Sequence, residues 1–257
     1  RLTDSMTKSP HHLAIIIDGN RRWARQRGMP ALRGHQRGAE TLKTITRHAH
    51  GCGIRWITAF AFSFENWSRP KPEVDGLIGL LRGFLENDVG VLNEENVKLR
   101  VIGNRSRFSS RLGKLIEWAE QETTANTGIN LTLALDYGGR QEVTSAARKL
   151  ATEVANGMLD PGDINEDMLK SRMGSAALPD IDLLIRTGGE QRVSNFMLWD
   201  ISYAELHFTP AFWPDFSTDD LDRALQDFAG RERRFGGDGG VGAQDAVTSL
   251  SDRRRIS

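Results

Sequence analysis

A short apolar run near the N-terminus leads directly into a group of polar residues that could do chemistry. Leu13 to Ile17 are five apolar residues, a pattern typical of a strand buried on both faces. Asp18, Gly19 and Asn20 follow at once, and a helical pattern begins at Arg21. A carboxylate at the carboxyl end of a parallel strand lies where open α/β sheets bind their ligands. Asp18 is therefore the first candidate functional residue.

Further polar clusters follow, or stand beside, later strand-like runs. They are "SFENWSRP" (63–70), "DYGGR" (136–140), "RTGGEQRVSNF" (186–196) and the glutamate of "AELHF" (204–208). Loops at one edge of a parallel sheet converge in space. We therefore expect one cleft that holds the side chains of Asp18, Arg22, Arg69, Arg186, Arg192 and Glu205.

Several arginines and two acids in one cleft suit a polyanion bridged by a divalent cation. The forked guanidinium donors of arginine match phosphate oxygens. Mg²⁺ typically takes one or two carboxylates together with substrate phosphate oxygens. The chain has no G-x-x-x-x-G-K-[ST], and no G-x-G-x-x-G stands between a strand-like and a helix-like run. The pattern therefore indicates a diphosphate rather than a nucleotide, with Mg²⁺ as cofactor.

The remaining sequence alternates between strand-like and helix-like runs. Beyond 13–17, strands are expected at 54–62, 97–103, 129–137, 179–189 and 204–208. Helices are expected up to residue 50, with an interruption near 29–34, and at 73–96, 107–126, 139–157 and 217–235. Such alternation favours βαβ units, and hence an α/β fold with a mainly parallel sheet and right-handed crossovers. No linker or repeat is visible before residue 235, which indicates one domain.

Composition excludes several classes of protein. Apolar residues make up 39% of the chain, as in an ordinary globular protein. The 34 basic residues balance the 34 acidic ones, which argues against a nucleic-acid partner. Cys52 is the single cysteine, so an internal disulfide is excluded and a reducing, cytoplasmic location is expected. The polar start "RLTDSMTKSP" does not look like a signal peptide.

The ends of the chain differ in composition from the rest. The tail is rich in glycine and then polar, so we expect residues 1–10 and 238–257 to be flexible termini. The final "SDRRRIS" is basic, and we expect from it at most weak contact with a membrane surface.

Each functional feature also has an ordinary structural explanation. An aspartate after a strand is often a turn former or a helix cap. The leucines of 73–96 fit simple core packing as well as one wall of an apolar tunnel, and Gly188-Gly189 fits an ordinary turn as well as a phosphate-binding one. The functional interpretation gains weight because these features share one sheet edge.

Five blocks together are similar to the signature blocks of the cis-prenyltransferases, the undecaprenyl diphosphate synthase family. They are "HLAIIIDGNRRWA", "FSFENWSRP", "DYGGR", "DLLIRTGGEQRVSNFMLW" and "YAELHFTPAFWPDF", and the resemblance spans residues 11–237 in order. It implies a single α/β domain with a central, mostly parallel six-stranded sheet flanked by helices. It also implies an apolar tunnel between sheet and helices, and a homodimer.

The resemblance implies a Mg²⁺-dependent enzyme that condenses an allylic diphosphate with isopentenyl diphosphate. The product is a Z-prenyl diphosphate, and diphosphate is released. The growing apolar chain would enter the tunnel, whose expected lining includes Ile78, Phe84, Leu131 and Leu135.

Site residues are implied by the same resemblance. Catalytic positions correspond to Asp18, Asn20, Ser63 and Asn66. Substrate-binding positions correspond to Gly19, Arg21, Arg22, Trp23, His35, Trp67, Arg69, Arg186, Arg192 and Ser194. Metal-binding positions correspond to Asp18 and Glu205. A C-terminal block that reaches toward the partner subunit corresponds to Arg234, Phe235, Gly236 and Gly237.

Two departures from the family pattern lie on the allylic side. In "GMPALRGH" the position of an arginine that clamps the allylic diphosphate is Ala31, and an arginine stands two residues later. Either Arg33 reaches the same phosphate or the clamp is weaker. In "SFENW" Phe64 stands where the family usually has threonine or serine. Arg21 also replaces the usual glycine, a variant that occurs in the family.

These departures keep a second function open. A few relatives join two allylic diphosphates head-to-middle, from dimethylallyl with dimethylallyl or geranyl diphosphate, and make branched, lavandulyl-type diphosphates. A third alternative is a non-catalytic subunit that supports a catalytic partner. Such subunits lose the residues that this chain keeps, which are Asp18, Asn20, Arg186, Arg192, Ser194 and Glu205.

Overall fold

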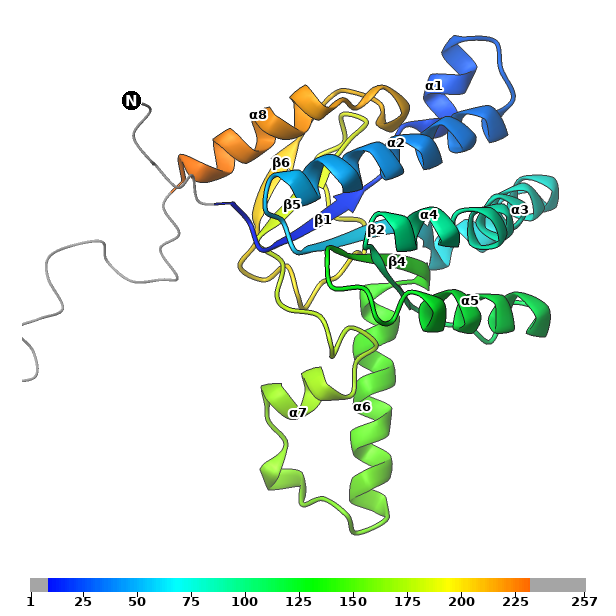
Figure 1. The fold of residues 1–257 in the computed structure, drawn as a ribbon. Helices are drawn as coiled ribbons and strands as arrows, with labels where there is room; N and C mark the ends of the chain where they lie inside the picture. The colour runs from blue at the N-terminus through cyan, green and yellow to red at the C-terminus, as the bar shows by residue number, and fades with distance from the viewer. Residues whose placement is uncertain (1–8, 232–257) are drawn as a thin grey trace, which may run out of the picture.

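A six-stranded parallel sheet forms the centre of the computed structural model, which describes residues 9–231 (Figure 1). Its order is β3-β4-β2-β1-β5-β6. The strands are β1 (His12–Ile16), β2 (Trp56–Ser63), β3 (Lys98–Ile102), β4 (Asn130–Tyr137), β5 (Leu183–Arg186) and β6 (Glu205–Phe208). Every neighbouring pair is parallel. The predicted single-domain α/β fold with six strands is confirmed.

Eight α-helices and three short 3₁₀ turns connect the strands within the described residues. The helices are α1 (Asn20–Gln26), α2 (Ala31–Gly51), α3 (Lys71–Asn87), α4 (Val89–Glu94), α5 (Ser110–Glu122), α6 (Gly139–Ala155), α7 (Glu166–Ser171) and α8 (Thr218–Ala229). The 3₁₀ turns are η1 (Phe64–Ser68), η2 (Pro161–Asp163) and η3 (Trp213–Asp215). In Figure 1, α6 and α7 extend together away from the other helices.

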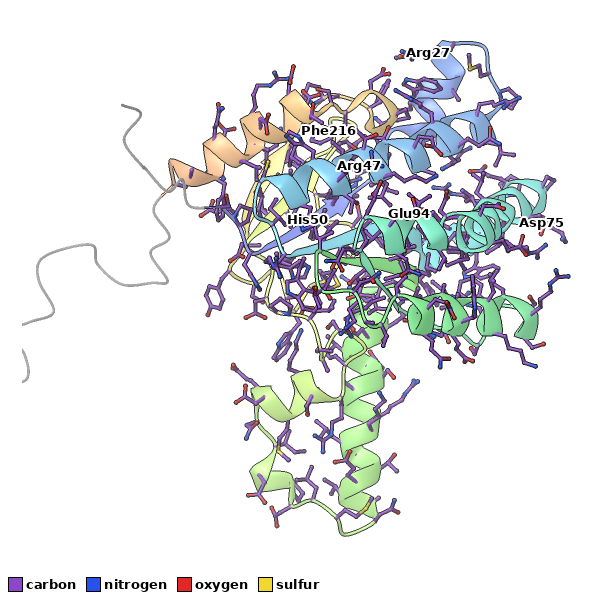
Figure 2. The ribbon with its side chains drawn as sticks, viewed as in Figure 1. Arg27, Arg47, His50, Asp75, Glu94 and Phe216 are labelled. Carbon is purple, nitrogen blue, oxygen red and sulfur yellow. The ribbon has the colours of Figure 1, made fainter. Side chains whose placement is uncertain are left out.

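The two faces of the sheet are buried against different parts of the chain. Successive strand residues point to opposite faces, so Leu13 and Ile15 of β1 lie in a core with α2, α3, α4, α5 and α8. Phe216, which follows η3, belongs to this core and is 4% exposed (Figure 2). Ala14 and Ile16 lie on the other face, in a core with the loop residues Phe196 and Met197. Burial on both faces explains the unbroken apolar run of β1.

Two elements differ from the sequence-based prediction. The helix expected at 73–96 is divided at Asp88, which ends α3, begins α4 and pairs with Lys43 of α2 at 2.8 Å. Val89, Gly90 and Val91 follow, and their weak helix propensity favours a break there. The second element is α7, a helix of six residues that Asn165 caps and that none of the expected helices covers.

His12 gives the fold a defined dependence on pH. Its ring nitrogens bond the carbonyl of Pro179 (2.7 Å) and the hydroxyl of Thr58 (2.8 Å), and burial lowers its pKa to about 4. Between this pKa and the ordinary value of 6.5 the unfolded chain binds more protons than the folded one. Neutral His12 therefore contributes fully to the free energy of unfolding above pH 6.5, and this contribution is lost as the pH falls toward 4.

We expect this loss to reach about 1.4 kcal/mol per pH unit. Urea unfolding of the unchanged chain and of His12→Gln, measured from pH 7 to pH 4, tests it. The difference in stability between the two proteins should shrink as the pH falls. A difference that is constant with pH would contradict the assignment.

No helix in residues 9–231 combines the length and the apolar character that crossing a membrane requires.

Candidate active site

Asp18 lies in a tight turn at the carboxyl end of β1. Its Oδ1 accepts the Gly19 N–H at 2.6 Å, and Thr187 Oγ1 accepts the Asp18 N–H at 3.0 Å and donates to the Asp18 carbonyl at 2.7 Å. Gly19 has φ +107°, and a Cβ there would lie 2.7 Å from the Phe212 ring. A side chain at position 19 is therefore disfavoured both by the positive φ of the backbone and by the clash with Phe212. The turn fixes where the carboxylate points.

Arg186, the last residue of β5, connects Asp18 to the loop that follows. It is 4% exposed, and its Nη2 donates to Asp18 Oδ2 at 3.0 Å. Its Nη1 donates to the Arg192 carbonyl and to Ser194 Oγ, both at 2.6 Å. One buried guanidinium thus joins three residues that the sequence predicted as site residues.

A chain of ion pairs continues from this centre toward solvent. Arg22 Nη2 lies 3.2 Å from Asp18 Oδ2, and Arg22 Nη1 lies 3.6 Å from Glu190 Oε1. Glu190 Oε2 also accepts from Arg192 Nη1 at 2.6 Å. A Cβ on Gly188 would lie 2.6 Å from Arg22 Nη2, so glycine there keeps space for this arginine. Acidic side chains thus lie between the arginines of this chain of ion pairs. A bound anion could take the place of these acids as the partner of the arginines.

The loop after β5 carries backbone strain. Ser194, Asn195 and Met197 all have φ between +44° and +63°, a region that L-residues with side chains seldom adopt. Such conformations persist where surrounding contacts enforce them, and they gather at ligand-binding sites. Here the enforcing contact on Ser194 is its bond from Arg186.

A polar cavity of about 730 Å³ opens in front of Asp18. Its charged lining consists of one acid and four arginines, which are Asp18, Arg21, Arg22, Arg25 and Arg69. The excess of positive charge suits a multiply charged anion, and guanidinium groups suit phosphate oxygens. Arg25 was not among the predicted residues, although its position one helical turn after Arg21 indicates a shared helix face.

An apolar cavity of about 110 Å³ adjoins the polar one, and Ile17, Asn20 and His35 line both. Its remaining lining comes from α2, α3, β2 and β4, and includes Leu42, Phe62, Leu77, Ile78, Leu80, Leu81, Phe84, Leu133 and Leu135. Of the residues predicted to line a tunnel, Ile78, Phe84 and Leu135 are found there. Leu131 instead lines a separate cavity of about 20 Å³, which Phe84 also lines.

Two glycines of α2 bring the helix close to α1. A Cβ on Gly34 would lie 2.0 Å from the Asn20 carbonyl oxygen, and one on Gly38 would lie 2.4 Å from Asn20 Oδ1. This close approach places Asn20 and His35 between the two cavities. Burial, and then the charge of Arg69, lower the pKa of His35 to about 4, so its ring is neutral at pH 7.

Several buried polar atoms of the predicted site have no hydrogen-bond partner in the part of the chain that the structure describes. They are Asn20 Oδ1, His35 Nε2, Trp67 Nε1 and Arg186 Nε. Three other atoms of this kind occur elsewhere, so the site holds four of seven. Buried polar groups are normally paired. Asn20 and His35 line the polar cavity, so a polar ligand there would supply their missing partners, whereas Trp67 and Arg186 do not line it.

Ser63, the last residue of β2, lies at the same sheet edge as Asn66 and Trp67 of η1, but none of the three lines the polar cavity. Asn66 Oδ1 accepts the Ser63 N–H at 3.0 Å, which fixes η1. Trp67 packs on Phe62, with ring centroids 5.2 Å apart. The Arg107 guanidinium lies over the ring of Phe64 at 4.4 Å and over the ring of Trp67 at 5.2 Å.

Ala31 and Arg33 take different positions at the start of α2. Ala31 lines the polar cavity, whereas Arg33 does not and donates from Nη1 to Gln36 Oε1 at 3.1 Å. The structure therefore does not place Arg33 where an arginine at position 31 would be. Arg69, held by Glu73 at 2.9 Å, and Arg21, 3.4 Å from the same carboxylate, line the cavity.

Two more predicted residues, Trp23 and Glu205, lie away from the polar cavity, and Arg186, Arg192 and Ser194 do not line it either. Trp23 turns toward η3, and its Nε1 donates to Asp215 Oδ1 at 2.7 Å. Glu205 is the first residue of β6 and pairs with Arg231 at 2.9 Å. Its register with Leu183, and that of Leu183 with Leu13, put Glu205 at the amino edge of the sheet. It lies five residues below Asp18, roughly 16 Å along the strand direction.

The predicted C-terminal block of Arg234, Phe235, Gly236 and Gly237 lies outside the described residues, as do most of both predicted termini.

Comparison with known proteins agrees with this geometry. The family model described as "Putative undecaprenyl diphosphate synthase" matches residues 16–236. Isoprenyl transferase 2 of Bradyrhizobium diazoefficiens is 49% identical over 229 residues, which cover 89% of this chain and 91% of that protein. Isoprenyl transferase of Agrobacterium fabrum is 46% identical over 234 residues, covering 91% and 95%.

Two crystal structures share the fold. Lavandulyl diphosphate synthase from Lavandula x intermedia, in complex with dimethylallyl diphosphate, superposes with a TM-score of 0.86 at 41% identity. The match covers 91% of this chain and 100% of that one. A probable undecaprenyl diphosphate synthase from Campylobacter jejuni gives 0.74 at 31% identity, covering 89% and 99%. The chain therefore belongs to the undecaprenyl diphosphate synthase family and is a prenyltransferase of the cis-prenyl diphosphate synthase type.

Proposed function

We propose that this enzyme condenses an allylic diphosphate with isopentenyl diphosphate to form a Z-prenyl diphosphate. The observation that carries the proposal is the junction of the two cavities. An arginine-lined polar cavity suits diphosphate, and an apolar cavity that shares Ile17, Asn20 and His35 with it suits a hydrocarbon chain. A prenyl diphosphate has these two parts, joined at one carbon.

The donor set at Asp18 fits Mg²⁺. The Asp18 carboxylate is 31% exposed and lines the polar cavity, where substrate phosphate oxygens would complete the coordination that Mg²⁺ prefers. Bound there, the ion would neutralise charge on the leaving diphosphate as the allylic C–O bond breaks.

The chain's own residues have distinct tasks in this reaction. Arg22, which lines the polar cavity beside Asp18, would donate to phosphate oxygens and stabilise their growing charge. Arg186 contacts Asp18 but is not part of that lining, and it holds the carboxylate in position. His35 lies at the junction of the two cavities and is neutral at pH 7. It would orient the substrate there without adding charge to the apolar cavity. The leucines of α3 exclude water from the hydrocarbon chain and hold it by apolar burial.

An omission series tests the proposal. Purified protein is incubated with farnesyl diphosphate, isopentenyl diphosphate and Mg²⁺, and released diphosphate is measured. We expect release only when all three are present, and loss of release when EDTA is added. Equal release without isopentenyl diphosphate or without the metal would contradict the proposal.

Irregular coupling of two allylic diphosphates is a second candidate function. It is favoured by the likeness to lavandulyl diphosphate synthase and by Ala31, which leaves the allylic side of the cavity without an arginine at that position. Dimethylallyl diphosphate supplied alone, or with geranyl diphosphate, distinguishes it. A branched alcohol after dephosphorylation would support this candidate against the first.

Phe84 is expected to limit product length. Its side chain lies between the apolar cavity and the cavity of about 20 Å³, and lines both. Phe84→Ala should join the two cavities and lengthen the main product by at least one five-carbon unit, as measured by mass spectrometry. Leu85→Ala is the matched control, because Leu85 is a fully buried neighbour on α3 that lines neither cavity. The same longer product from the control would refute the assignment.

Glu205 can serve a metal on Asp18 only from a second copy of the chain, since about 16 Å of strand separates them within one copy. We propose a homodimer in which it does so. Asp18→Asn and Glu205→Gln should each be inactive alone. Their co-expressed mixture should regain about a quarter of the sites, because one of the two sites in each mixed dimer is then intact.

Light scattering supplies the oligomeric state for this experiment. A dimer whose mixture stays inactive would contradict the assignment of Glu205, as would a fully active Glu205→Gln protein. A monomer would refute the homodimer itself.

A further inference from the structure

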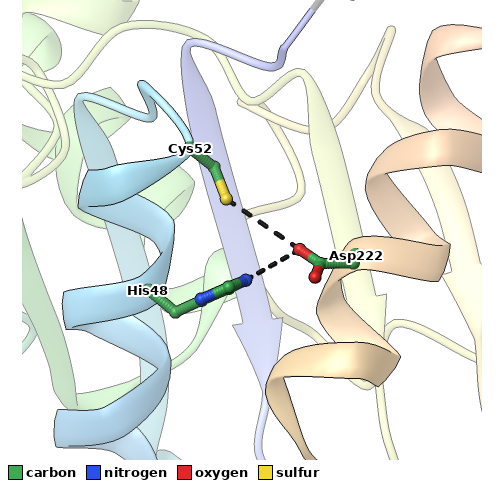
Figure 3. Close-up of side chains that lie close together, drawn as sticks. All are labelled: His48, Cys52 and Asp222. Carbon is green, nitrogen blue, oxygen red and sulfur yellow. Dashed lines mark hydrogen bonds and ion pairs between the residues drawn. The ribbon is translucent and has the colours of Figure 1, made fainter.

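A second group of ligating side chains lies between the C-terminal end of α2 and α8. Asp222 Oδ1 of α8 is 2.7 Å from His48 Nε2 and 3.9 Å from Cys52 Sγ (Figure 3). All three ligand atoms lie within 4.8 Å of one another. None of these residues lines the polar or the apolar cavity.

The local structure directs these three side chains at one point. His48 and Cys52 are four residues apart, and residues at this spacing share one face of a helix. Asp222 lies in the second turn of α8 and faces them from the neighbouring helix, as Figure 3 shows. The ligand atoms around a tetrahedral Zn²⁺ lie roughly 3.3–3.8 Å apart, given Zn–N near 2.0 Å and Zn–S near 2.3 Å. Shifts of well under 1 Å bring the His48–Asp222 and Cys52–Asp222 separations into this range. The ligand atoms of His48 and Cys52 lie within 4.8 Å of each other and need to approach by at most about 1 Å.

The donor set selects the kind of metal. An imidazole, a thiolate and one carboxylate are ligands that Zn²⁺ accepts, whereas Mg²⁺ prefers oxygen alone. The site differs in this respect from Asp18, which offers only oxygen. His48 is 31% exposed and Asp222 is 44% exposed, so water can reach a fourth coordination position.

The Cys52 thiol lies beside the Asp222 carboxylate, with its Sγ 3.9 Å from Oδ1. Burial, and then the nearby charge of Asp222, raise its pKa. Binding of a metal converts the S–H group into a metal–sulfur bond and releases the proton to solvent.

We propose that His48, Cys52 and Asp222 form a zinc site that clamps α8 to α2. The site is structural and separate from the reaction centre. The first half of α2 carries His35 and the two glycines, Gly34 and Gly38, that pack closely against Asn20. The other helix, α8, is the last element of the described chain. A clamp there fixes the far end of the helix that carries the cavity junction.

Metal binding to the 257-residue chain tests the proposal. Apo-protein is titrated with Zn²⁺, and with Co²⁺ as a spectroscopic substitute. We expect one equivalent to bind, a thiolate-to-cobalt charge-transfer band to appear, and Tm to rise on addition of Zn²⁺. Cys52→Ser, His48→Gln and Asp222→Asn should each weaken binding at least tenfold, and Cys52→Ser should remove the band.

Two control variants keep the test specific. His50→Gln removes an imidazole at the same end of α2 (Figure 2) and should leave the cobalt spectrum unchanged. Asp18→Asn removes the carboxylate of the reaction centre and should also leave it unchanged. Absence of binding would overturn the proposal and leave an ordinary His48–Asp222 pair between two helices. Binding that survives both Cys52→Ser and His48→Gln would overturn it as well.

Discussion

Asp18→Asn is expected to lower kcat by about 10³ while the fold stays intact. Asparagine keeps the size of the side chain and an oxygen that can accept the Gly19 N–H, which now bonds Asp18 Oδ1 at 2.6 Å. It removes the negative charge that contacts Arg22 and Arg186 and that would hold Mg²⁺. Steady-state rates at saturating substrate, with circular dichroism and Tm as checks on folding, measure the effect.

Asp215→Asn is the matched control for this prediction. Asp215 is also a carboxylate near α1, where it pairs with Arg27 at 3.0 Å, but it does not line the polar cavity. Its loss should change kcat less than threefold, since exposed ion pairs contribute little. A well-folded Asp18→Asn protein with near-normal kcat would refute the assignment of both the metal and the leaving group.

Arg186→Gln is expected to lower kcat/KM by about 10²–10³. The guanidinium is almost fully buried and donates to Asp18, to Ser194 and to the Arg192 carbonyl. Its Nε is buried and has no partner within residues 9–231. The change therefore removes a donor to Asp18 and takes from the loop that carries Ser194 its bond from Arg186.

Arg33→Gln is the control for loss of an arginine near the site. Arg33 lies at the start of α2, next to Ala31, but bonds Gln36 and does not line the cavity. We expect its kcat/KM to stay within threefold of the unchanged enzyme. If Arg33→Gln matched Arg186→Gln in effect, the role given to Arg186 would be wrong, and Arg33 would be the phosphate ligand after all.

The sheet and the meeting of Asp18 with Arg186 could be predicted from the sequence for one physical reason. Parallel strands buried on both faces are continuous apolar runs, and their carboxyl ends share an edge. Asp18 after β1 and Arg186 at the end of β5 are therefore brought together, although 168 residues separate them. The same rule predicts that the turn after β2 lies at that edge.

The rest depends on features that spacing does not encode. Glu205 is the first residue of its strand, whereas the other candidates lie at or after the ends of theirs. It therefore lies at the amino edge of the sheet, opposite the edge that carries Asp18. Trp23 shares a short helix with Arg22 but faces η3, where its Nε1 donates to Asp215 Oδ1, a partner that the spacing of residues does not reveal. Thr187 and Glu190, which hold Asp18 and Arg22, stand in the quoted "RTGGEQR" motif, yet their partners emerge only from the folded loop.

The geometry of the double bond in the product tests the central claim most directly. Purified enzyme is supplied with farnesyl diphosphate, isopentenyl diphosphate and Mg²⁺, and the dephosphorylated products are identified by mass spectrometry and NMR. We predict linear alcohols that grow by five-carbon units, carry newly formed Z double bonds and require isopentenyl diphosphate. New double bonds in the E geometry would contradict this account, and so would a branched product made without isopentenyl diphosphate.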